Sequence, residues 1–424
     1  MNNHKLKALL TIKNGKDHKA LDAGNIPVFG SGGLMRYVNQ FIYDEESILL
    51  PRKGSLDNIQ YADKPFWTVD TLYYTVVNKE KVNAYYLYNY LKQLDLSSLN
   101  SGTGVPSMTF GAYYDINVKL PALDIQQKIA SVLSSLDAKI EINNRINTEL
   151  EQMAKTLYDY WFVQFDFPNE QDKPYKSSGG KMVYNPELKR EIPEGWEVKS
   201  LANWIEADKG GDWGKESEQG NYTSKVNCIR GADINGLNGR GALKSPIRYI
   251  LEKNETKILE PNDLIVEISG GSPTQSTGRL AYITDGALER FENPIICSNF
   301  CKALSLKDSK QLYYFAYYWN LIYDNDILFG WEGKTSGIKN LLFDSFVNHY
   351  KIPQPEDSFV AKFNAFVGPL EKMKQKNLQQ NQQLAALRDW LLPMLMNGQV
   401  TVKEAEEKVS ELGVAAEPEV KYKS

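Results

Sequence analysis

Cysteine and histidine are both scarce in this chain of 424 residues, which contains three of each. Three cysteines cannot form a disulfide framework, and the three histidines show no spacing typical of zinc ligands. We therefore expect reduced thiols within a core and no metal site; the residues concerned are Cys228, Cys297, Cys301, His4, His18 and His349.

Long apolar runs and an excess of basic residues are also missing. No segment approaches the length of a membrane span, and the N-terminal sequence MNNHKLKALL lacks the apolar stretch of a secretory signal. These absences predict a soluble, cytoplasmic protein without membrane contacts. The net charge of −4 excludes a broadly basic nucleic-acid coat, so any DNA binding must come from local patches.

The common catalytic motifs are absent as well. The chain has no GxxxxGK[ST] loop, no GxSxG elbow and no HExxH helix. The glycine-rich stretch 29–33 superficially resembles a methyl-donor loop, but Met35 to Val38 follow it in place of a helix, and no Asn-Pro-Pro-aromatic tetrapeptide occurs. A tight turn is the simpler interpretation, and we predict no catalytic residue.

The chain does contain an internal repeat. Each position of the repeat in the second half lies 234 residues after its counterpart in the first half. A long heptad-patterned segment follows Lys-Leu-Pro at 119–121, and another follows Lys-Ile-Pro at 351–353. Seven of nine apolar positions in the first segment remain apolar at this offset, the exceptions being Lys374 and Gln380. The nine positions are Ile129, Val132, Leu133, Leu136, Ile140, Ile146, Leu150, Met153 and Leu157. Two matching helices in one chain can pair with each other.

Paired asparagines support this interpretation. Asn143 and Asn147 correspond to Asn377 and Asn381 at the same offset, where a packed seam would otherwise favour leucine or isoleucine. A buried asparagine lowers stability but fixes register and partner. The predicted helix seam comprises Leu136, Ile140, Asn143, Asn147, Leu150, Leu370, Asn377, Asn381 and Leu384.

The order of segments predicts an α+β fold with two similar α/β domains and two long antiparallel coiled-coil helices in pseudo-twofold symmetry. Strands are predicted at 48–50, 71–77 and 116–120, and a helix at 82–94. We expect Asp124 to cap the first long helix, with Gln127 completing a capping box. The expected parts are a first domain (1–122), a central helix (123–166), a linker (167–191), a second domain (192–355), a C-terminal helix (356–400) and a tail (401–424), helical to about Leu412.

Polar glycine-containing loops recur in both halves and are the candidate binding elements. Arg52 to Ser55 and Ser269 to Arg279 each follow a predicted strand, and loops at 101–107 and 333–339 match at an offset of 232. Guanidinium, amide and hydroxyl groups suit base edges and phosphates, although an ordinary solvated loop is the alternative for any single residue. Tyrosines at 85–90 and 313–318 lie on predicted helices, where core packing is favoured over base stacking.

These residues together resemble the specificity subunits of Type I restriction-modification enzymes. The resemblance covers essentially the whole chain and rests on the order and spacing of short motifs: IPVFGSGG at 26–33, LPRKGS at 50–55, SGTG at 101–104, KLPALDIQQKIA at 119–130, IPEGW at 192–196, EISGGSP at 267–273 and KIP at 351–353. The second helix departs from the pattern, with PEDSF at 355–359 where the first has LDIQQ.

The resemblance implies a non-catalytic subunit whose two target-recognition domains each read one half of a bipartite, asymmetric sequence in double-stranded DNA, with the helices fixing the spacer. It implies two methyltransferase subunits that use S-adenosylmethionine, and motor-nuclease subunits, as partners; this chain itself would hold no cofactor. The expected DNA contacts are Ser31, Arg36, Arg52, Lys53, Ser55, Thr103, Ser107, Arg230, Ser269, Ser272, Thr274, Gln275, Arg279, Lys334 and Lys339. The alternatives are a free-standing DNA methyltransferase and a structural coiled-coil adaptor.

Overall fold

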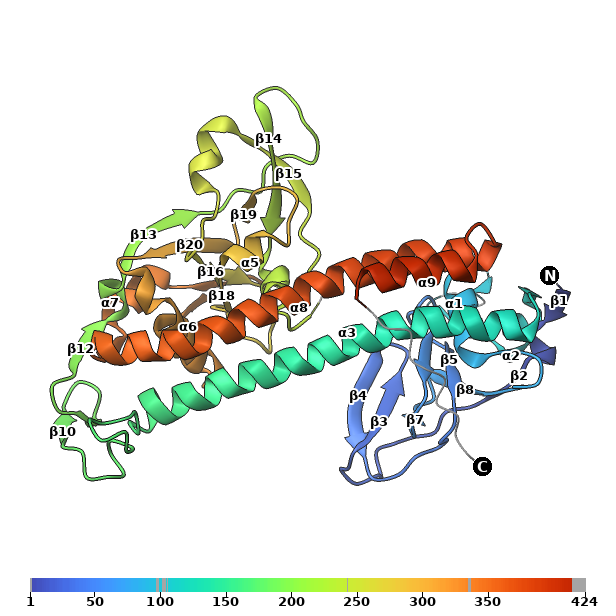
Figure 1. Ribbon diagram of the computed structural model, residues 1–424, viewed down its shortest axis with the longest axis horizontal. Helices are drawn as coiled ribbons and strands as arrows, with labels where there is room; N and C mark the ends of the chain where they lie inside the picture. The colour runs from blue at the N-terminus through green and yellow to red at the C-terminus, as the bar shows by residue number, and fades with distance from the viewer. Residues whose placement is uncertain are drawn as a thin grey trace. The chain divides into compact units, whose positions relative to one another are not determined.

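The computed structural model describes residues 2–96, 99, 100, 104, 106–241, 243–334 and 337–413 (Figure 1). The chain divides into two compact units, and the division falls within both long helices. Unit 1 consists of Met1–Ile140 and Gln383–Ser424, and unit 2 of Glu141–Gln382. The two long helices are α3 (Leu123–Tyr158) and α8 (Asp357–Asn397). Each unit therefore combines one domain of strands and short helices with a portion of each long helix.

The domain of unit 1 is built on three small sheets. Each sheet contains neighbouring strands that are not consecutive in the sequence. Among the named strands of this domain, only β3 and β7 pair in parallel. The central strand β5 is buried along its whole length, because its apolar run is covered on both faces. The strands are β1 (Asn2–Lys5) with β9 (Asn117–Leu120); β2 (Leu10–Lys13), β8 (Leu72–Val77), β5 (Ser47–Pro51) and β6 (Gln60–Ala62); and β4 (Gly33–Val38), β3 (Ile26–Gly30) and β7 (Trp67–Thr68).

The domain of unit 2 repeats these three sheets in the same strand order. Of the named strands in these sheets, only β14 and β19 pair in parallel, as β3 and β7 do in unit 1. The strands are β12 (Glu197–Ser200) with β23 (Lys351–Gln354); β13 (Ile205–Gly210), β20 (Cys301–Leu306), β16 (Leu264–Glu267) and β18 (Leu280–Tyr282); and β15 (Ile247–Leu251), β14 (Tyr222–Ile229) and β19 (Ile295–Cys297). The predicted duplication of the α+β domain is confirmed at the level of topology.

Unit 2 also contains strands that have no counterpart among the named strands of unit 1. The first and last strands of the unit 1 domain begin at Asn2 and Asn117, and those of the unit 2 domain begin at Glu197 and Lys351. The second domain is therefore the longer of the two. Its additional strands are β17 (Ser269–Gly270), β22 (Lys339–Leu341) and β21 (Glu332–Lys334), which form one sheet.

Short helices complete both domains. They are α1 (Ala84–Lys92) and α2 (Phe110–Tyr114) in unit 1, and α4 (Ile234–Leu237), α5 (Asp285–Leu288), α6 (Leu312–Asp324) and α7 (Phe343–His349) in unit 2. Asn83 caps α1 by accepting a hydrogen bond from the amide of Tyr86. The tyrosine-rich segments pack inward, since Tyr86 and Tyr314 are fully buried. The prediction of core packing for these tyrosines is confirmed.

The start of α3 differs from the prediction. The helix begins at Leu123, so Asp124 lies inside its first turn and does not cap it. The start is fixed by Gln126, which is 1 % exposed. Its side chain accepts a hydrogen bond from the amide of Asn83 at 3.1 Å and donates one to the carbonyl of Pro121 at 3.0 Å. The capping prediction was wrong because it considered only the local motif of Asp124 and Gln127. The start of the helix depends on Gln126, whose partner Asn83 is distant in the sequence.

The segment predicted as a linker carries structure of its own. After α3 ends, a π-helical turn spans Asp159–Val163, and a hairpin follows from β10 (Met182–Asn185) and β11 (Arg190–Pro193). Phe167 is 2 % exposed and stacks on Trp196, with ring centroids 5.4 Å apart. The composition of 167–191 was that of a linker, but its aromatic residues anchor it to the core of unit 2.

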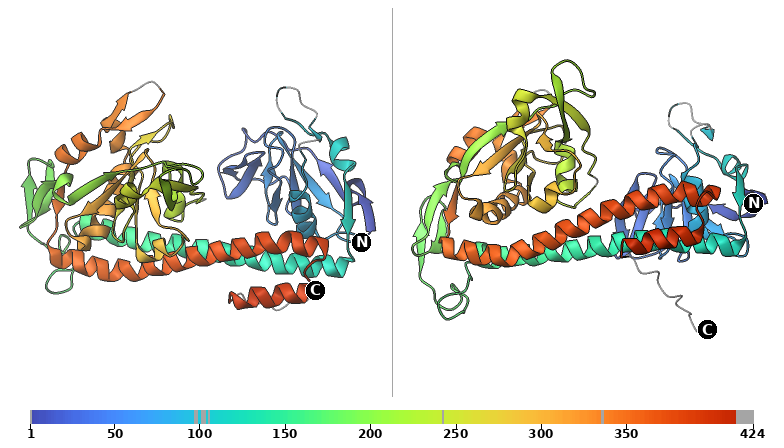
Figure 2. Two further views of the ribbon diagram at one scale, coloured as in Figure 1. Left: turned by 90° about the horizontal axis from the view of Figure 1, so that it is seen from above. Right: turned by 45° about the horizontal axis from the view of Figure 1, so that its top comes forward.

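The C-terminal end of the described chain belongs to unit 1. After Gly398, helix α9 (Val402–Glu411) runs back along the last turns of α8 (Figure 2). The ammonium group of Lys408 lies over the ring of Trp390. Thr401 and Glu404 form a capping box at the start of α9. Ala405 and Val409 are buried in the same hydrophobic cluster as Leu391 of α8. Among the described residues, no helix is long and apolar enough to cross a membrane.

Candidate nucleic-acid interface

In unit 1, the structure brings together the two polar loops that the sequence singled out. Lys53 and Ser107 form an antiparallel β-bridge. The amide of Gly54 donates to the carbonyl of Pro106, and the amide of Met108 donates to the carbonyl of Arg52, both at 2.9 Å. The loop that follows β5 and the loop that precedes α2 therefore form one surface.

Unit 2 builds the same surface with the same backbone hydrogen bonds. Ser269 pairs with Asn340 and Gly270 with Lys339, and the amide of Leu341 donates to the carbonyl of Ile268 at 2.9 Å. The amide of Ile268 donates to the carbonyl of Phe300, as that of Arg52 donates to Thr71 in unit 1. These shared bonds make Lys53 equivalent to Ser269, Ser107 to Asn340 and Thr71 to Phe300.

The backbone next to each surface also forms matching hydrogen bonds in the two units. The amide of Val69 donates to the carbonyl of Phe29 in unit 1, and the amide of Ser298 donates to the carbonyl of Ile229 in unit 2. Gly15 and Gly211 occupy matching positions, where an added Cβ would lie 2.1 Å and 2.0 Å from a backbone carbonyl oxygen. Asp17 follows Gly15 by two residues, and Trp213 follows Gly211 by two residues, so these two positions are equivalent as well. We call this common arrangement of backbone bonds the loop frame; it is shared, but the side chains it carries differ.

A cleft of about 600 Å³ lies within the loop frame of unit 2. Three large apolar side chains border it and remain exposed: Trp213 at 38 %, Phe300 at 51 % and Ile338 at 44 %. The rest of its lining is polar or lacks a large side chain, namely Arg230, Gly231, Ala232, Glu267, Ser269, Gly270, Gly271, Ser298 and Asn299. Clefts of this size with apolar walls and a few polar groups are typical of ligand sites.

The DNA-contact residues predicted in unit 1 divide into accessible and committed groups. Lys53 and Ser55 are exposed, and Arg52 is half-buried, with its guanidinium over Tyr73 and Nη1 donating to the carbonyl of Asp70. Ser31 is half-buried, and its carbonyl accepts a hydrogen bond from Asn58. Ser107 is half-buried at the bridge, whereas Thr103 lies outside the described residues.

Arg36 has a structural role that the sequence did not reveal. Its Nη2 donates to the carbonyls of His18 and Leu21, at 3.2 Å and 2.5 Å, so the guanidinium holds the loop that precedes β3. These contacts commit donors that a base or phosphate would need. The structure therefore argues against Arg36 as a direct DNA contact.

In unit 2, Arg279 is likewise committed to the interior. Its Nε and Nη2 donate to the two carboxylate oxygens of Glu267, at 2.8 Å and 2.7 Å. The arginine side chain is 18 % exposed and the glutamate side chain 7 %. This bidentate ion pair underlies the cleft, and it removes Arg279 from the set of residues that can read a base.

Arg230 borders the cleft but is partly engaged. Its Nε and Nη2 donate to Asp233 at 2.7 Å and 3.0 Å, and Nη2 also donates to the carbonyl of Lys244. Burial alone would raise the pKa of Asp233, but the hydrogen bonds from Arg230 and from the amide of Lys244 outweigh it and lower that pKa. Asp233 is thus a fixed anion that orients the Arg230 guanidinium.

The other predicted residues of unit 2 lie on the adjacent loop and sheet. Ser272 is half-buried, and Thr274 and Gln275 are exposed. Lys339 pairs with Glu332 at 3.3 Å and donates to the carbonyl of Gln275. The backbone of Lys334 belongs to β21, and its side chain lies outside the described residues.

Sequence reasoning missed the residues that distinguish the second surface most clearly. Trp213, Phe300 and Asn340 were not candidates. An aromatic residue next to strands is usually part of a core, and Asn340 lies just beyond the loop at 333–339 that the sequence singled out. A strand-by-strand alignment of the two halves would have matched Phe300 with Thr71, but only the structure shows that the Phe300 side chain is exposed.

The asparagines predicted for the helix seam meet within unit 2. The side-chain amide of Asn143 donates to Gln380 at 2.8 Å and to Asn381 at 2.9 Å, and that of Asn377 donates to Asn147 at 2.8 Å. As the residue number rises on α3 it falls on α8, so the paired segments are antiparallel. In unit 1, Asp137 of α3 pairs with Arg388 of α8 in the same sense.

The remaining seam positions vary in burial. Leu136, Leu150 and Leu384 are buried, whereas Ile140 and Leu370 are partly buried against the hydrophobic clusters of unit 1 and unit 2 respectively. Two apolar positions of the repeat that lie outside the predicted seam, Ile146 and Met153, are 37 % and 49 % exposed. They lie beside the seam, because the observed seam follows 143, 147, 150 and 154.

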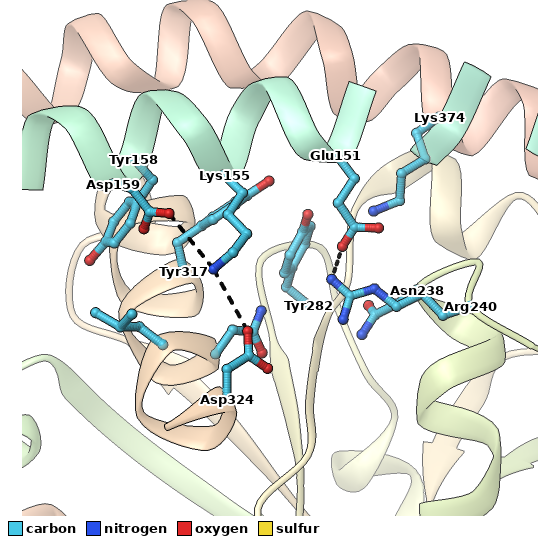
Figure 3. A pocket seen from close by; sticks show the side chains of 12 residues that line it. Glu151, Lys155, Tyr158, Asp159, Asn238, Arg240, Tyr282, Tyr317, Asp324 and Lys374 are labelled. Carbon is cyan, nitrogen blue, oxygen red and sulfur yellow. Dashed lines mark hydrogen bonds and ion pairs between the residues drawn. The ribbon is translucent and has the colours of Figure 1, made fainter. Parts of the chain in front are cut away.

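Polar contacts attach the domain of unit 2 to its helices. Glu151 of α3 pairs with Arg240, and Lys155 lies between Asp159 and Asp324, at 3.9 Å and 3.7 Å (Figure 3). The cavity among these residues measures about 30 Å³, which is the space of a single water molecule. This junction fixes the domain on the helix and is too small for a ligand.

The three thiols lie in the interior. Burial raises the pKa of Cys228 and of Cys297 to about 12, and it raises that of Cys301 further. They are therefore neutral at physiological pH and are poor nucleophiles. Within the described ranges, no group of three His, Cys, Asp or Glu side chains is placed to hold a metal ion.

Comparison with known proteins places these observations in context. Residues 1–152 and 193–363 match the family described as the Type I restriction modification DNA specificity domain. The chain is 26 % identical over 375 residues to the Type I restriction enzyme MjaIX specificity subunit of Methanocaldococcus jannaschii, covering 86 % of this chain and 79 % of that protein.

Two further similarities are shorter or purely structural. Over 71 residues, 17 % of this chain and 15 % of the relative, the chain is 41 % identical to the HindI specificity subunit of Haemophilus influenzae. It also shares its fold with the crystal structure of a Type I restriction-modification system S subunit from M. genitalium, with a TM-score of 0.58 and 17 % identity, over 93 % of this chain and 95 % of that one.

Proposed function

Because the chain belongs to the family of Type I restriction modification DNA specificity proteins, we propose that it is the non-catalytic subunit that selects the DNA target, with each recognition domain reading one half of a bipartite, asymmetric sequence. Methylation would be carried out by two partner methyltransferase subunits, which would supply the S-adenosylmethionine site, and cleavage by motor-nuclease subunits.

The loop frame is the observation that carries this proposal. Both domains use the same backbone bonds to present a surface, yet Lys53 and Ser107 in one are replaced by Ser269 and Asn340 in the other. A shared scaffold with different hydrogen-bonding groups suits two domains that dock alike and read different bases. An asparagine can pair with adenine in a bidentate fashion, which the serine at the equivalent position of unit 1 cannot do.

The helices would set the unread spacer between the two half-sites. The hydrogen bonds of Asn143 and Asn147 fix the register of α3 against α8, and a fixed register implies a fixed spacing. Matched insertions, one after Asn147 and one before Asn377, should lengthen the permitted spacer and leave both half-sites unchanged. A methylome with the original spacer would count against this role.

Exposed apolar side chains on the helices of unit 2 support the docking of a partner subunit. Ile142 and Met153 of α3 are 40 % and 49 % exposed, and Phe366 and Met373 of α8 are 42 % and 51 % exposed. Large apolar groups on a helix surface are typical of protein interfaces. Met153→Lys should weaken copurification of the methyltransferase, whereas Glu141→Lys, at an exposed polar position on a different side of α3, should not.

Methylome sequencing of variants tests the reading role of each domain. With the methyltransferase co-expressed, Arg52→Ala and Ser107→Ala should alter or weaken recognition of one half-site only, and Ser269→Ala and Asn340→Ala that of the other. If both pairs affect the same half-site, or if neither changes the motif or its occupancy, the assignment of these loops fails.

A further inference from the structure

The cleft of unit 2 has a chemical character that ordinary contact with a phosphate backbone would not require. Trp213, Phe300 and Ile338 border it with 38 %, 51 % and 44 % of their surface exposed. Exposed apolar side chains of this size, gathered at one cleft beside polar groups, mark a binding site. The cleft adjoins Ser269 and Arg230, so it is continuous with the proposed DNA-reading surface.

The walls of the cleft are held in place before any ligand binds. The guanidinium carbon of Arg248 lies 4.1 Å from the centroid of the Trp213 ring, and Arg248 is itself only 8 % exposed. One face of the indole is thereby covered. The carbonyl of Phe300 accepts the amides of Ile268 and Ser269, at 2.8 Å and 3.1 Å, which anchors the backbone that carries this ring.

The interior of the cleft is kept open by glycines over a rigid base. A Cβ added to Gly231 would lie 2.6 Å from Oε1 of Glu267, and one added to Gly271 would meet nothing within 4 Å. Beneath them, Glu267 is fixed by its bidentate pair with Arg279. Room for a flat ligand is therefore combined with hydrogen-bonding groups. They include the exposed side chain of Asn299 and the hydroxyl of Ser269, which donates to Oδ1 of Asn340 at 2.6 Å and can still accept a hydrogen bond.

The loop frame of unit 1 does not provide these aromatic walls. The position equivalent to Trp213 is Asp17, which follows Lys16 as Trp213 follows Asp212. The position equivalent to Phe300 is Thr71. At these two positions the aromatic side chains are present in unit 2 and absent from unit 1, so the role of the cleft must differ from the docking that both domains share.

We propose that this cleft binds a nucleobase that has left the base stack of the DNA, with the base packed against Phe300 and Trp213. A planar base offers a π-face to aromatic rings and polar edges to the serine, asparagine and backbone groups of the cleft. The inference rests on the proposed function, because it takes the base to belong to the half-site that unit 2 reads. A free nucleotide presents the same chemistry, and the experiment separates the two sources.

The test uses the full chain with its methyltransferase subunits and a duplex that carries the methylome-derived target. Each base of the second half-site is removed in turn, leaving an abasic position, and binding is measured. At one position, loss of the base should weaken binding roughly 5- to 160-fold, which is the range for one stacked base. Phe300→Ala should lose this dependence at that position, and Phe300→Tyr should keep it.

A matched control and a spectroscopic readout accompany the affinity measurement. Thr71→Ala, at the equivalent position of unit 1, should leave the second half-site unaffected. 2-Aminopurine at the identified position should report unstacking with the wild type and remain stacked with Phe300→Ala. If binding depends on the base and on Phe300 but 2-aminopurine stays stacked, the base is contacted within the helix and the proposal is overturned.

Two further outcomes separate this proposal from the proposed function. If the complex prefers its target but Phe300→Ala and Trp213→Ala bind every abasic duplex as the wild type does, the cleft proposal alone fails. If the complex shows no sequence preference, both fail. If free nucleoside monophosphates at millimolar concentration bind the DNA-free complex, and Phe300→Ala abolishes this binding, the cleft is a site for a soluble nucleotide. That outcome would overturn the proposal that the base comes from DNA.

Discussion

Asn143 donates a hydrogen bond to Asn381 at 2.9 Å across the seam of α3 and α8. The offset of the repeat relates this pair of residues to the neighbouring pair, Asn377 and Asn147. Adding 234 to 143 gives Asn377, and subtracting 234 from 381 gives Asn147, which share a bond of 2.8 Å. Two contacts related in this way are the signature of a twofold, self-complementary interface. The duplicated helices thus recognise each other locally as the two halves of a symmetric dimer would.

Removing one of these asparagines should destabilise unit 2. In Asn143→Ala, Gln380 and Asn381 lose the donor at their side-chain oxygens, at a site where Asn143 is 1 % exposed. The expected loss is about 1 to 3 kcal/mol in the free energy of unfolding, measured by urea denaturation. Glu149→Ala, on the exposed side of the same helix, should change it by less than about 0.5 kcal/mol.

Replacing both asparagine pairs of the seam with leucine should separate stability from register. Asn143→Leu with Asn381→Leu, combined with Asn147→Leu and Asn377→Leu, removes both partners of each pair, so neither pair leaves an unsatisfied polar group. Unfolding should return close to the wild-type free energy, while methylomes should show more than one spacer length, because the helices can then slide. A single unchanged spacer would show that other contacts set the register.

The ion pair beneath the cleft should be sensitive to loss of either partner. Arg279→Ala leaves the Glu267 carboxylate without its bidentate partner at 7 % side-chain exposure, which should cost about 3 to 5 kcal/mol in unfolding free energy. Lys79→Ala breaks a pair with Glu45 in which both side chains are more than half exposed and should cost at most about 1 kcal/mol. Equal losses in the two variants would contradict this account of the cleft.

Lys53 should act as a phosphate contact. Lys53→Ala is expected to weaken DNA binding to all sequences alike and to reduce the slope of log K against log salt by about 1. Binding titrations from low to moderate salt measure this slope. Lys403, which is 85 % exposed on α9 and lies on a different element, supplies the matched control variant.

The buried thiols give a prediction about pH. Burial raises the pKa of Cys228 and of Cys297 to about 12, compared with an ordinary value of 9.0. The folded state therefore favours the neutral thiol, so stability is complete below pH 9 and declines as the pH rises from 9 towards 12. Native protein should resist iodoacetamide at pH 8 and react after unfolding; rapid alkylation of the native chain would contradict the buried setting.

The long helices, the duplication and the seam asparagines were predictable because each depends on periodicity within the chain. The residues of the candidate nucleic-acid interface were less predictable from the sequence. Arg36 and Arg279 resembled exposed base readers, but their partners are the carbonyls of His18 and Leu21 and the carboxylate of Glu267, which only folding brings near. Phe300 shows the opposite case, since an aromatic residue flanked by strands is usually buried, and its exposure is visible only in the structure.

The central claim is that two domains of one chain read two different half-sites at a fixed spacing. Methylome sequencing of cells that co-express this chain with its methyltransferase tests it most directly. We predict one motif made of two unlike specified blocks, separated by an unspecified spacer of constant length, with a methylated adenine in each block. A continuous motif, a palindrome of identical halves, or methylation without a motif would contradict the account.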